Sequence, residues 1–288
     1  MLKLKTRIGP GYIVWSTIIS AAFVILLIGS LIANSWDAVV GGHITFDTTW
    51  DTSKNSYGIL PVIYGTLSVT LIAVLIAAPI GIKTAIFISE FLPKKLHLYV
   101  KSFLELLAGI PSIIYGLIGV GILNLWIQDL FQLQTGRTIL TAGLLLSFMI
   151  LPTIITLCDN ALRQIPNTFR ESAQGLGLYP FEVIKQVLLP MARPHMIGAI
   201  LLAIGRALGE TMAVMLIIGS IDKIPKPIFN ILTPGQTFTS KLGRELAESS
   251  FGSLHFSALV SLGLILLVIV VAISVIGQYF YRNTSVYE

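Results

Sequence analysis

The chain has 288 residues, of which 55% are hydrophobic and only 11% are charged, and its formal net charge is +5. Soluble domains carry about 25% charged residues, so this composition excludes an ordinary soluble domain and indicates a polytopic membrane protein. The positive charge does not indicate nucleic-acid binding, because the Lys and Arg residues flank apolar blocks and form no dense basic patch.

Six apolar blocks are long enough for a bilayer-spanning helix, which needs about 20 residues. We predict spans at 12–33, 59–82, 100–127, 138–158, 194–219 and 256–281. The first block is too long for the apolar region of a signal peptide, and no clear cleavage motif closes it, so we interpret it as a retained span. The segment that follows it, 34–58, has three Asp residues and a single Lys, and we expect it to lie outside the membrane.

The third block, 100–127, contains residues that interrupt regular helix packing, namely Gly109, Pro111 and Ser112. A proline in a spanning helix leaves a carbonyl without its intrahelical donor, so protein or cavity water must supply one. Two interpretations follow: a kink that lets a pore wall bend, or close helix packing through small residues. Glu105 follows Lys101 by one helical turn near the start of this block, which predicts an ion pair at the inner membrane interface.

The connection 159–193 is expected to form two short helices, 166–175 and 180–189, separated by a glycine-rich turn. Pro190 is predicted to end the second helix and Pro194 to begin the next span. The second helix has one apolar face, formed by Phe181, Ile184 and Leu188. Such a face fits a groove on a partner protein, and it equally fits an amphipathic helix that lies on lipid.

Two charges, Arg206 and Glu210, lie inside the apolar block 194–219. At a spacing of four residues they are expected one turn apart on a single helix face. In one interpretation the pair neutralises itself inside the bundle. In the other, Arg206 lines a path for an anion, since its planar guanidinium suits carboxylate and phosphate oxygens, and Glu210 competes for it and so helps release the anion.

The positions of Lys and Arg predict the orientation of the chain. They concentrate in the N-terminal segment, in 83–101, in 159–193 and in the C-terminal tail, and they are fewer in the other connections. Both termini are therefore expected in the cytoplasm. The outer connection 220–255 weakens this asymmetry with four basic residues, and it is long enough to carry a surface helix near 240–249.

Several catalytic and cofactor motifs are missing. The sequence has no P-loop signature, and the Gly-Leu-Gly at 175–177 follows no strand, which argues against dinucleotide binding. The four His residues are scattered and Cys158 is the single cysteine, so we expect no metal site, no internal disulfide and no cofactor in this chain. Ser253 and His255 are too close in sequence to form the buried dyad of an intramembrane protease.

A resemblance supplements these observations. The connection 159–193 resembles the EAA loop of ABC importer permeases, whose pattern is Glu-Ala-Ala, three residues, Gly, nine residues and Ile-x-Leu-Pro. This chain keeps that spacing, with Ser and Val as substitutions, at Glu171, Ser172, Ala173, Gly177, Val187, Leu189 and Pro190. The resemblance implies an all-α type I importer permease (MetI-like) fold and a loop that docks on an ATPase subunit.

Two further stretches, 106–119 and 203–219, are similar to the permeases of phosphate importers. The run from Arg206 to Val214 resembles the PstC type more than its PstA sister. The resemblance implies a pore shared with a PstA-like permease, PstB-like ATPase subunits that use ATP, and a PstS-like phosphate-binding protein outside a bacterial inner membrane. The chain itself would not be an enzyme.

On this basis we divide the chain into a first helix with its outer segment (1–58), a five-helix permease core (59–282) and a cytoplasmic tail (283–288). Four alternatives stay open: a permease for another oxyanion such as molybdate or phosphonate, a sister phosphate permease subunit of the PstA type, a membrane enzyme or scaffold with no ATPase partner, and a passive anion channel.

Overall fold

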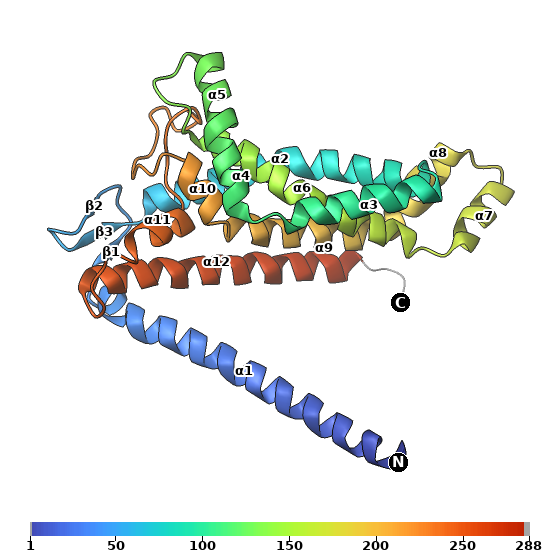
Figure 1. The fold of residues 1–288 in the computed structure, drawn as a ribbon, viewed down its shortest axis with the longest axis horizontal. Helices are drawn as coiled ribbons and strands as arrows, with labels where there is room; N and C mark the ends of the chain where they lie inside the picture. Colours follow the sequence, from blue (N-terminus) through green and yellow to red (C-terminus); the bar gives the residue numbers. More distant parts are fainter. Residues whose placement is uncertain (1, 285–288) are drawn as a thin grey trace.

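The computed structural model describes the backbone of residues 2–284 and the side-chain environment of residues 12–277. Figure 1 shows a bundle in which α2 (Leu60–Glu90), α6 (Ile139–Arg163), α9 (Leu189–Leu208) and α12 (Leu254–Thr284) run along a common direction. The N-terminal α1 (Leu2–Val40) contacts α12 at one end of the bundle and diverges from it toward the other. Of the predicted tail, residues 285–288 lie outside the described residues.

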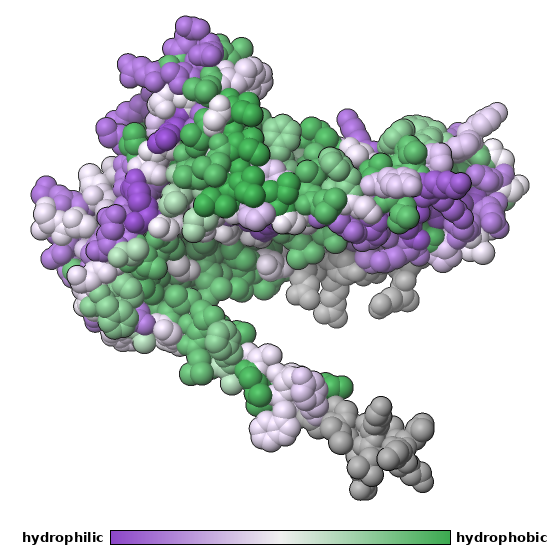
Figure 2. Space-filling model, in the orientation of Figure 1, coloured by the Kyte–Doolittle hydropathy of each residue, from purple (hydrophilic) through white to green (hydrophobic). Residues whose placement is uncertain are grey.

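Six helical segments of the described chain are long and apolar enough to cross a membrane, as predicted. They are Tyr12–Val40, Leu60–Glu90, Ser112–Phe131, Ile139–Arg163, Pro180–Leu208 and Leu254–Gly277. Figure 2 shows the corresponding apolar band, with hydrophilic residues gathered at both ends of the bundle. The third segment begins later than predicted because the chain breaks at Ile110 and Pro111, and the fifth begins earlier because the helix continues through Pro190 and Pro194.

The centre of the bundle is the contact between α2 and α6, where glycines let the two helices approach closely. A Cβ atom on Gly81 would lie 2.7 Å from Ile154, and one on Gly143 would lie 2.6 Å from Ile72. Small residues at helix contacts are the usual means of close packing in membranes. The pair α2–α6 can therefore move as one unit, and α9 packs against both helices.

The predicted third span is in fact two helices. The first, α3 (Lys94–Gly109), packs against α6, and the chain then becomes extended at Ile110 and Pro111. A residue before proline is disfavoured in the helical region, and proline lacks the N–H that would continue the helix. The second piece joins α4 (Ser112–Ile118), a π-helical turn η1 (Gly119–Leu123) and α5 (Asn124–Phe131), which projects from the bundle (Figure 1). The predicted kink is thus a complete break.

The predicted ion pair between Lys101 and Glu105 is absent from the described side chains. Lys101 Nζ instead donates to Asn160 Oδ1 at 3.2 Å, and Glu105 is exposed. The neighbouring His97 is buried, and its Nε2 lies 2.9 Å from Asp159 Oδ2. The polar contacts of α3 therefore fasten it to α6 and not to its own next turn.

The prediction that Pro190 ends a short helix and that Pro194 begins a span was wrong. One helix runs from α8 (Pro180–Val183) through a π-helical turn η2 (Ile184–Leu188) into α9, and both prolines lie within it. The Leu189 N–H donates to Ile184 O, five residues back, so the helix widens just before Pro190. This widening accommodates a residue that has no N–H to donate and whose ring crowds the preceding turn.

Polar connections gather at the end of the bundle opposite α8. We call this region, which includes residues 34–58 and 220–255, the cap. Three short strands, β1 (Ile44–Thr45), β2 (Trp50–Asp51) and β3 (Ser56–Gly58), form a sheet in the order β1-β3-β2. The expected surface helix exists as α11 (Phe238–Glu245), but it begins two residues before the predicted range, and its first four residues are buried. The cap therefore has a small core of its own.

Candidate translocation path and coupling loop

Arg206 lies in the last turn of α9 and is exposed on the surface of the isolated chain. Its Nη1 atom donates to Thr153 Oγ1 of α6 at 3.2 Å. No ion pair joins Arg206 to any carboxylate among the described side chains. The guanidinium is always charged, so this span carries a positive charge that remains available to an anion.

Glu210 does not share a helix with Arg206, contrary to the prediction. Helix α9 ends at Leu208, and α10 (Met212–Ile217) begins after a break. Glu210 Oε1 accepts a hydrogen bond from Ala213 N at 3.3 Å, and the Glu210 carbonyl accepts one from the Thr239 hydroxyl at 2.6 Å. The interpretation in which the two charges neutralise each other within one helix face is therefore wrong for this structure.

The predicted coupling loop forms a protruding helix and turn at the end of the bundle opposite the cap (Figure 1). Helix α7 (Asn167–Gly175) carries Glu171 and Ser172 on its exposed side and buries Ala173 in the core. Gly177 has a φ of +87°, a conformation that glycine adopts without strain. The space around Gly177 is open, so the backbone conformation alone requires a glycine there.

The apolar face predicted for the second short helix is divided by the structure. Ile184 and Leu188 are buried in the chain's own core, whereas Phe181 is 70% exposed. Leu176 and Tyr179 are also largely exposed. Together we call Leu176, Tyr179 and Phe181 the apolar knob of the coupling loop. Of the other motif residues, Val187 and Leu189 are half-buried and Pro190 is exposed.

Sequence reasoning missed an ion pair that fastens this loop to the bundle. Arg170 of α7 donates from Nε and Nη2 to the two carboxylate oxygens of Glu90, at 3.2 and 2.8 Å. It also donates to the carbonyls of Leu162 and Ile165 at 3.0 and 2.8 Å. Glu90 is the last residue of α2, and the two partners are 80 residues apart in sequence, so no local pattern could reveal the pair.

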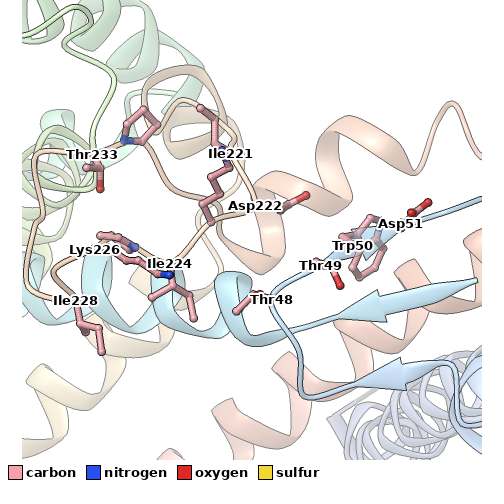
Figure 3. A pocket seen from close by; sticks show the side chains of 13 residues that line it. Thr48, Thr49, Trp50, Asp51, Ile221, Asp222, Ile224, Lys226, Ile228 and Thr233 are labelled. Atoms are coloured by element: carbon pink, nitrogen blue, oxygen red, sulfur yellow. The ribbon is translucent and has the colours of Figure 1, made fainter. Parts of the chain in front are cut away.

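The two segments expected to face the outer side come together in the cap. A cavity of about 1060 Å³ opens between residues 48–51 and 221–234 (Figure 3). Lys223 and Lys226 line it, together with threonine hydroxyls and apolar side chains. At its edge the pKa of Asp51 is lowered, chiefly because the Ser53 hydroxyl and then the Ser53 N–H donate to its carboxylate.

Beside this cavity lies a buried cluster around Lys241, which is fully buried. Its Nζ atom lies 2.6 Å from Asp222 Oδ2 and 3.1 Å from Glu245 Oε1. It also lies 4.2 Å from the ring centroid of Trp50, which belongs to the sheet. One cation thus connects β2, the loop 220–237 and α11.

We compared the chain with known proteins. The family described as "Binding-protein-dependent transport system inner membrane component" matches residues 77–286. The chain belongs to this family. It is therefore an inner-membrane component of a transport system, and not a catalytic subunit. The matched range includes Arg206, Glu210 and the whole coupling loop, and it begins after α1.

Named relatives have similar lengths. The phosphate transport system permease protein PstC of Mesorhizobium japonicum is 37% identical, with 90% of this chain and 86% of that protein covered. The probable phosphate transport system permease protein PstC of Methanocaldococcus jannaschii is 31% identical, with 98% and 96% covered. The probable ABC transporter permease protein YqgH of Bacillus subtilis is 38% identical, with 75% and 69% covered.

Solved importer structures share the fold. An inward-facing MetNI methionine ABC transporter matches with a TM-score of 0.61 at 18% identity, covering 78% of this chain and 95% of that one. A bacterial alginate ABC transporter, in complex with an alginate-loaded periplasmic protein, matches with a TM-score of 0.63 at 16% identity and covers 98% of each chain. The predicted type I importer permease fold is thereby confirmed.

Proposed function

We propose that this family member is the permease subunit of an ATP-driven importer of inorganic phosphate and forms half of its pore. The relatives named PstC, which align with nearly the whole chain, support phosphate as the substrate. The observation that carries the proposal is Arg206, a guanidinium without a carboxylate partner in a spanning helix of the described chain. An unneutralised cation in a membrane segment is costly, and it is typical of an ion path.

The arrangement of the chain supports cytoplasmic termini. The first residues of α1 and the last residues of α12 lie at the same end of the bundle as α7 (Figure 1). The cap lies at the opposite end. If the coupling loop contacts an ATPase in the cytoplasm, both termini face the cytoplasm and the cap faces a binding protein outside, across a bilayer that surrounds the apolar band.

We assign the partners by surface. Residues 171–190, with the apolar knob, contact an ABC ATPase of the PstB type. The cap, including 34–58 and 220–255, receives a phosphate-binding protein of the PstS type. A sister permease of the PstA type completes the pore around residues 59–282, with α1 outside this five-helix core. ATP is hydrolysed by the partner, and this chain holds no cofactor.

Two breaks in the spans supply the movement, one between α3 and α4 and one between α9 and α10. ATP-driven closure of the ATPase pair displaces the coupling loop, and the spans then change which side of the membrane the pore faces. The extended residues Ile110 and Pro111, which lie between Gly109 and Ser112, act as the hinge between α3 and α4. Arg206 attracts the anion, and its hydrogen bond to Thr153 keeps it oriented without holding phosphate in a closed ion pair.

The test is ATP-dependent phosphate uptake into vesicles that contain the complete complex. Arg206→Gln should abolish uptake while the ATPase subunits still co-purify, and Glu210→Gln should impair it. Arg137→Gln is the matched control, because Arg137 is an exposed arginine outside the spans. Unchanged uptake in Arg206→Gln would refute the role of this residue.

The same vesicles distinguish the alternatives. Inhibition of phosphate uptake by excess molybdate or phosphonate, with preferred transport of either, would indicate another oxyanion. Anion current without ATP would indicate a passive channel. A chain that never binds an ATPase subunit would indicate a membrane enzyme or scaffold.

A further inference from the structure

The ion pair between Arg170 and Glu90 joins the coupling loop to the spanning helices. Among the described side chains it is the one ion pair that links α7 to a spanning helix. Both side chains are mostly buried, with 19% of Arg170 and 13% of Glu90 exposed. Solvent therefore screens this pair less than a surface ion pair.

The guanidinium of Arg170 joins α7 to the ends of two spanning helices, α2 and α6. Two nitrogens form a fork on Glu90 at the end of α2, and two hydrogen bonds reach the carbonyls of Leu162 and Ile165 at the end of α6. Leu162 lies in the last turn of α6 and Ile165 lies just after that helix, where a cation complements the helix dipole. Lysine has no such planar fork and could not reproduce this geometry.

Side-chain packing beside the ion pair is incomplete. A cavity of about 110 Å³ lies there, lined by Glu90, Phe91, Gln174 and the start of α8. Helix α7 also reaches the bundle through Ala173, which is buried in the core, and through the chain into α8 and α9. The ion pair is the direct charged link between α7 and the end of α2.

From α2 the path continues to the proposed anion site. Helices α2 and α6 approach closely at Gly81 and Gly143 and so move together. Helix α6 carries Thr153, the hydrogen-bond acceptor for Arg206. Movement of the loop therefore has a contiguous physical route to Arg206.

We infer that the Arg170–Glu90 pair is the joint that transmits displacement of the ATPase-docking loop to α2 and α6, and through them to Arg206. The inference rests on the proposed importer function. Arg170 and Glu90 act as positioning residues in this inference, because both side chains are mostly buried in the chain itself. Their role differs from that of the apolar knob, which would bind the ATPase subunit.

The test uses the complete complex in proteoliposomes and three readouts: co-purified ATPase subunit, ATP hydrolysis, and phosphate imported per ATP hydrolysed. In Arg170→Gln and Glu90→Gln the ATPase should remain bound and hydrolyse ATP, while phosphate imported per ATP falls about tenfold or more, the scale of one lost charge-assisted contact. Arg170→Lys should keep only part of this ratio. The exchanged pair Arg170→Glu with Glu90→Arg should not recover the ratio, because a carboxylate at position 170 would face the carbonyls of Leu162 and Ile165.

Lys95→Gln is the matched control, because Lys95 is an exposed cation of α3 that lies outside the loop. If the pair merely stabilised the fold, uptake and hydrolysis would fall in parallel and phosphate imported per ATP would not change, which would overturn the inference. Wild-type complexes that import no phosphate would instead refute the proposed function.

A substrate-independent readout keeps the inference testable in that case. A spin label placed by Lys83→Cys on α2, with Cys158 replaced by Ser, reports movement of α2 when ATP binds the complex. Lys83 is exposed and lies seven residues before Glu90 on the same helix. Loss of the ATP-dependent spectral change in Arg170→Gln supports the joint, and an unaltered change overturns it.

Discussion

Replacement of Lys241 by Met tests whether one buried cation holds the outer cap together. The substitution keeps most of the apolar length of the side chain and removes its charge. Glu245 would retain Arg244, whose Nη2 lies 3.1 Å away, but Asp222 would lose its single ion-pair partner among the described side chains. One oxygen of Asp222 already has no hydrogen-bond partner and is buried.

The cost can be worked out from these contacts. Removing one partner of a fully buried ion pair costs about 3–5 kcal/mol. Asp222 and Glu245 keep 24% and 19% of their side-chain surface exposed, which moves the estimate to the lower end of that range, about 3 kcal/mol. At about 2–4 °C per kcal/mol, the apparent Tm in detergent should fall by roughly 6–12 °C.

The assay is thermal unfolding of the purified chain, with hydrogen exchange at residues 44–58 and 238–245 as a local measure of the cap. Lys223→Met is the matched control, because Lys223 is an exposed lysine that also belongs to the cap. Adding Asp222→Asn to Lys241→Met should restore part of the loss, since it removes the orphaned charge. An unchanged Tm and unchanged exchange in Lys241→Met would refute the reasoning.

Two glycines provide further predictions. Gly177→Ala should weaken co-purification of the ATPase subunit, because alanine in a left-handed conformation costs about 1–2 kcal/mol. Gly175→Ala is the control and should not weaken it, because Gly175 lies in helix α7 with open space around it. Equal co-purification of the two variants would contradict the role of the turn. Gly143→Ala should destabilise the bundle by about 1–3 kcal/mol through its close contact with Ile72, measured by thermal unfolding. Its control Gly198→Ala, where a Cβ meets nothing, should be neutral or slightly stabilising, and equal Tm values would contradict the proposed close approach of α2 and α6.

The number of spans was predictable because a bilayer imposes a minimum length on each apolar block. The two short helices at 167–183 and the turn between them were predictable, because their glycines and prolines lie within one short segment. The helix breaks were harder to predict. Pro111 lies in an apolar block and Pro190 lies at the end of the predicted coupling loop, yet the chain breaks completely at Pro111 and continues through a π-helical turn before Pro190. Contacts with neighbouring helices decide between a complete break and a π-helical turn, and a local sequence pattern does not contain those contacts.

The charged contacts of the loop and the cap could not be predicted for a related reason. Arg170 finds Glu90 across 80 residues, and Lys241 finds Asp222 across 19, each from an element with a different local structure. The division of the apolar face was also hidden, since Phe181 and Ile184 lie one turn apart with opposite exposure. Helical periodicity identifies an apolar face, but it cannot say which part the chain buries itself and which part it presents to a partner.

The break after α9 changes how Glu210 can act on an anion. Its carboxylate accepts the Ala213 N–H in this structure, so it satisfies the start of α10 and does not neutralise Arg206. Irregular backbone at membrane depth is tolerated where protein or water satisfies it, and here Glu210 supplies both a side-chain and a backbone acceptor. For Glu210 to compete with phosphate for Arg206, its carboxylate must first leave the Ala213 N–H. Helix α10 packs against α4 at Gly116, just beyond the hinge at Pro111. In the proposed mechanism, movement of α4 would therefore disturb α10 and free Glu210, and release of the anion would be coupled to the proposed hinge at Pro111.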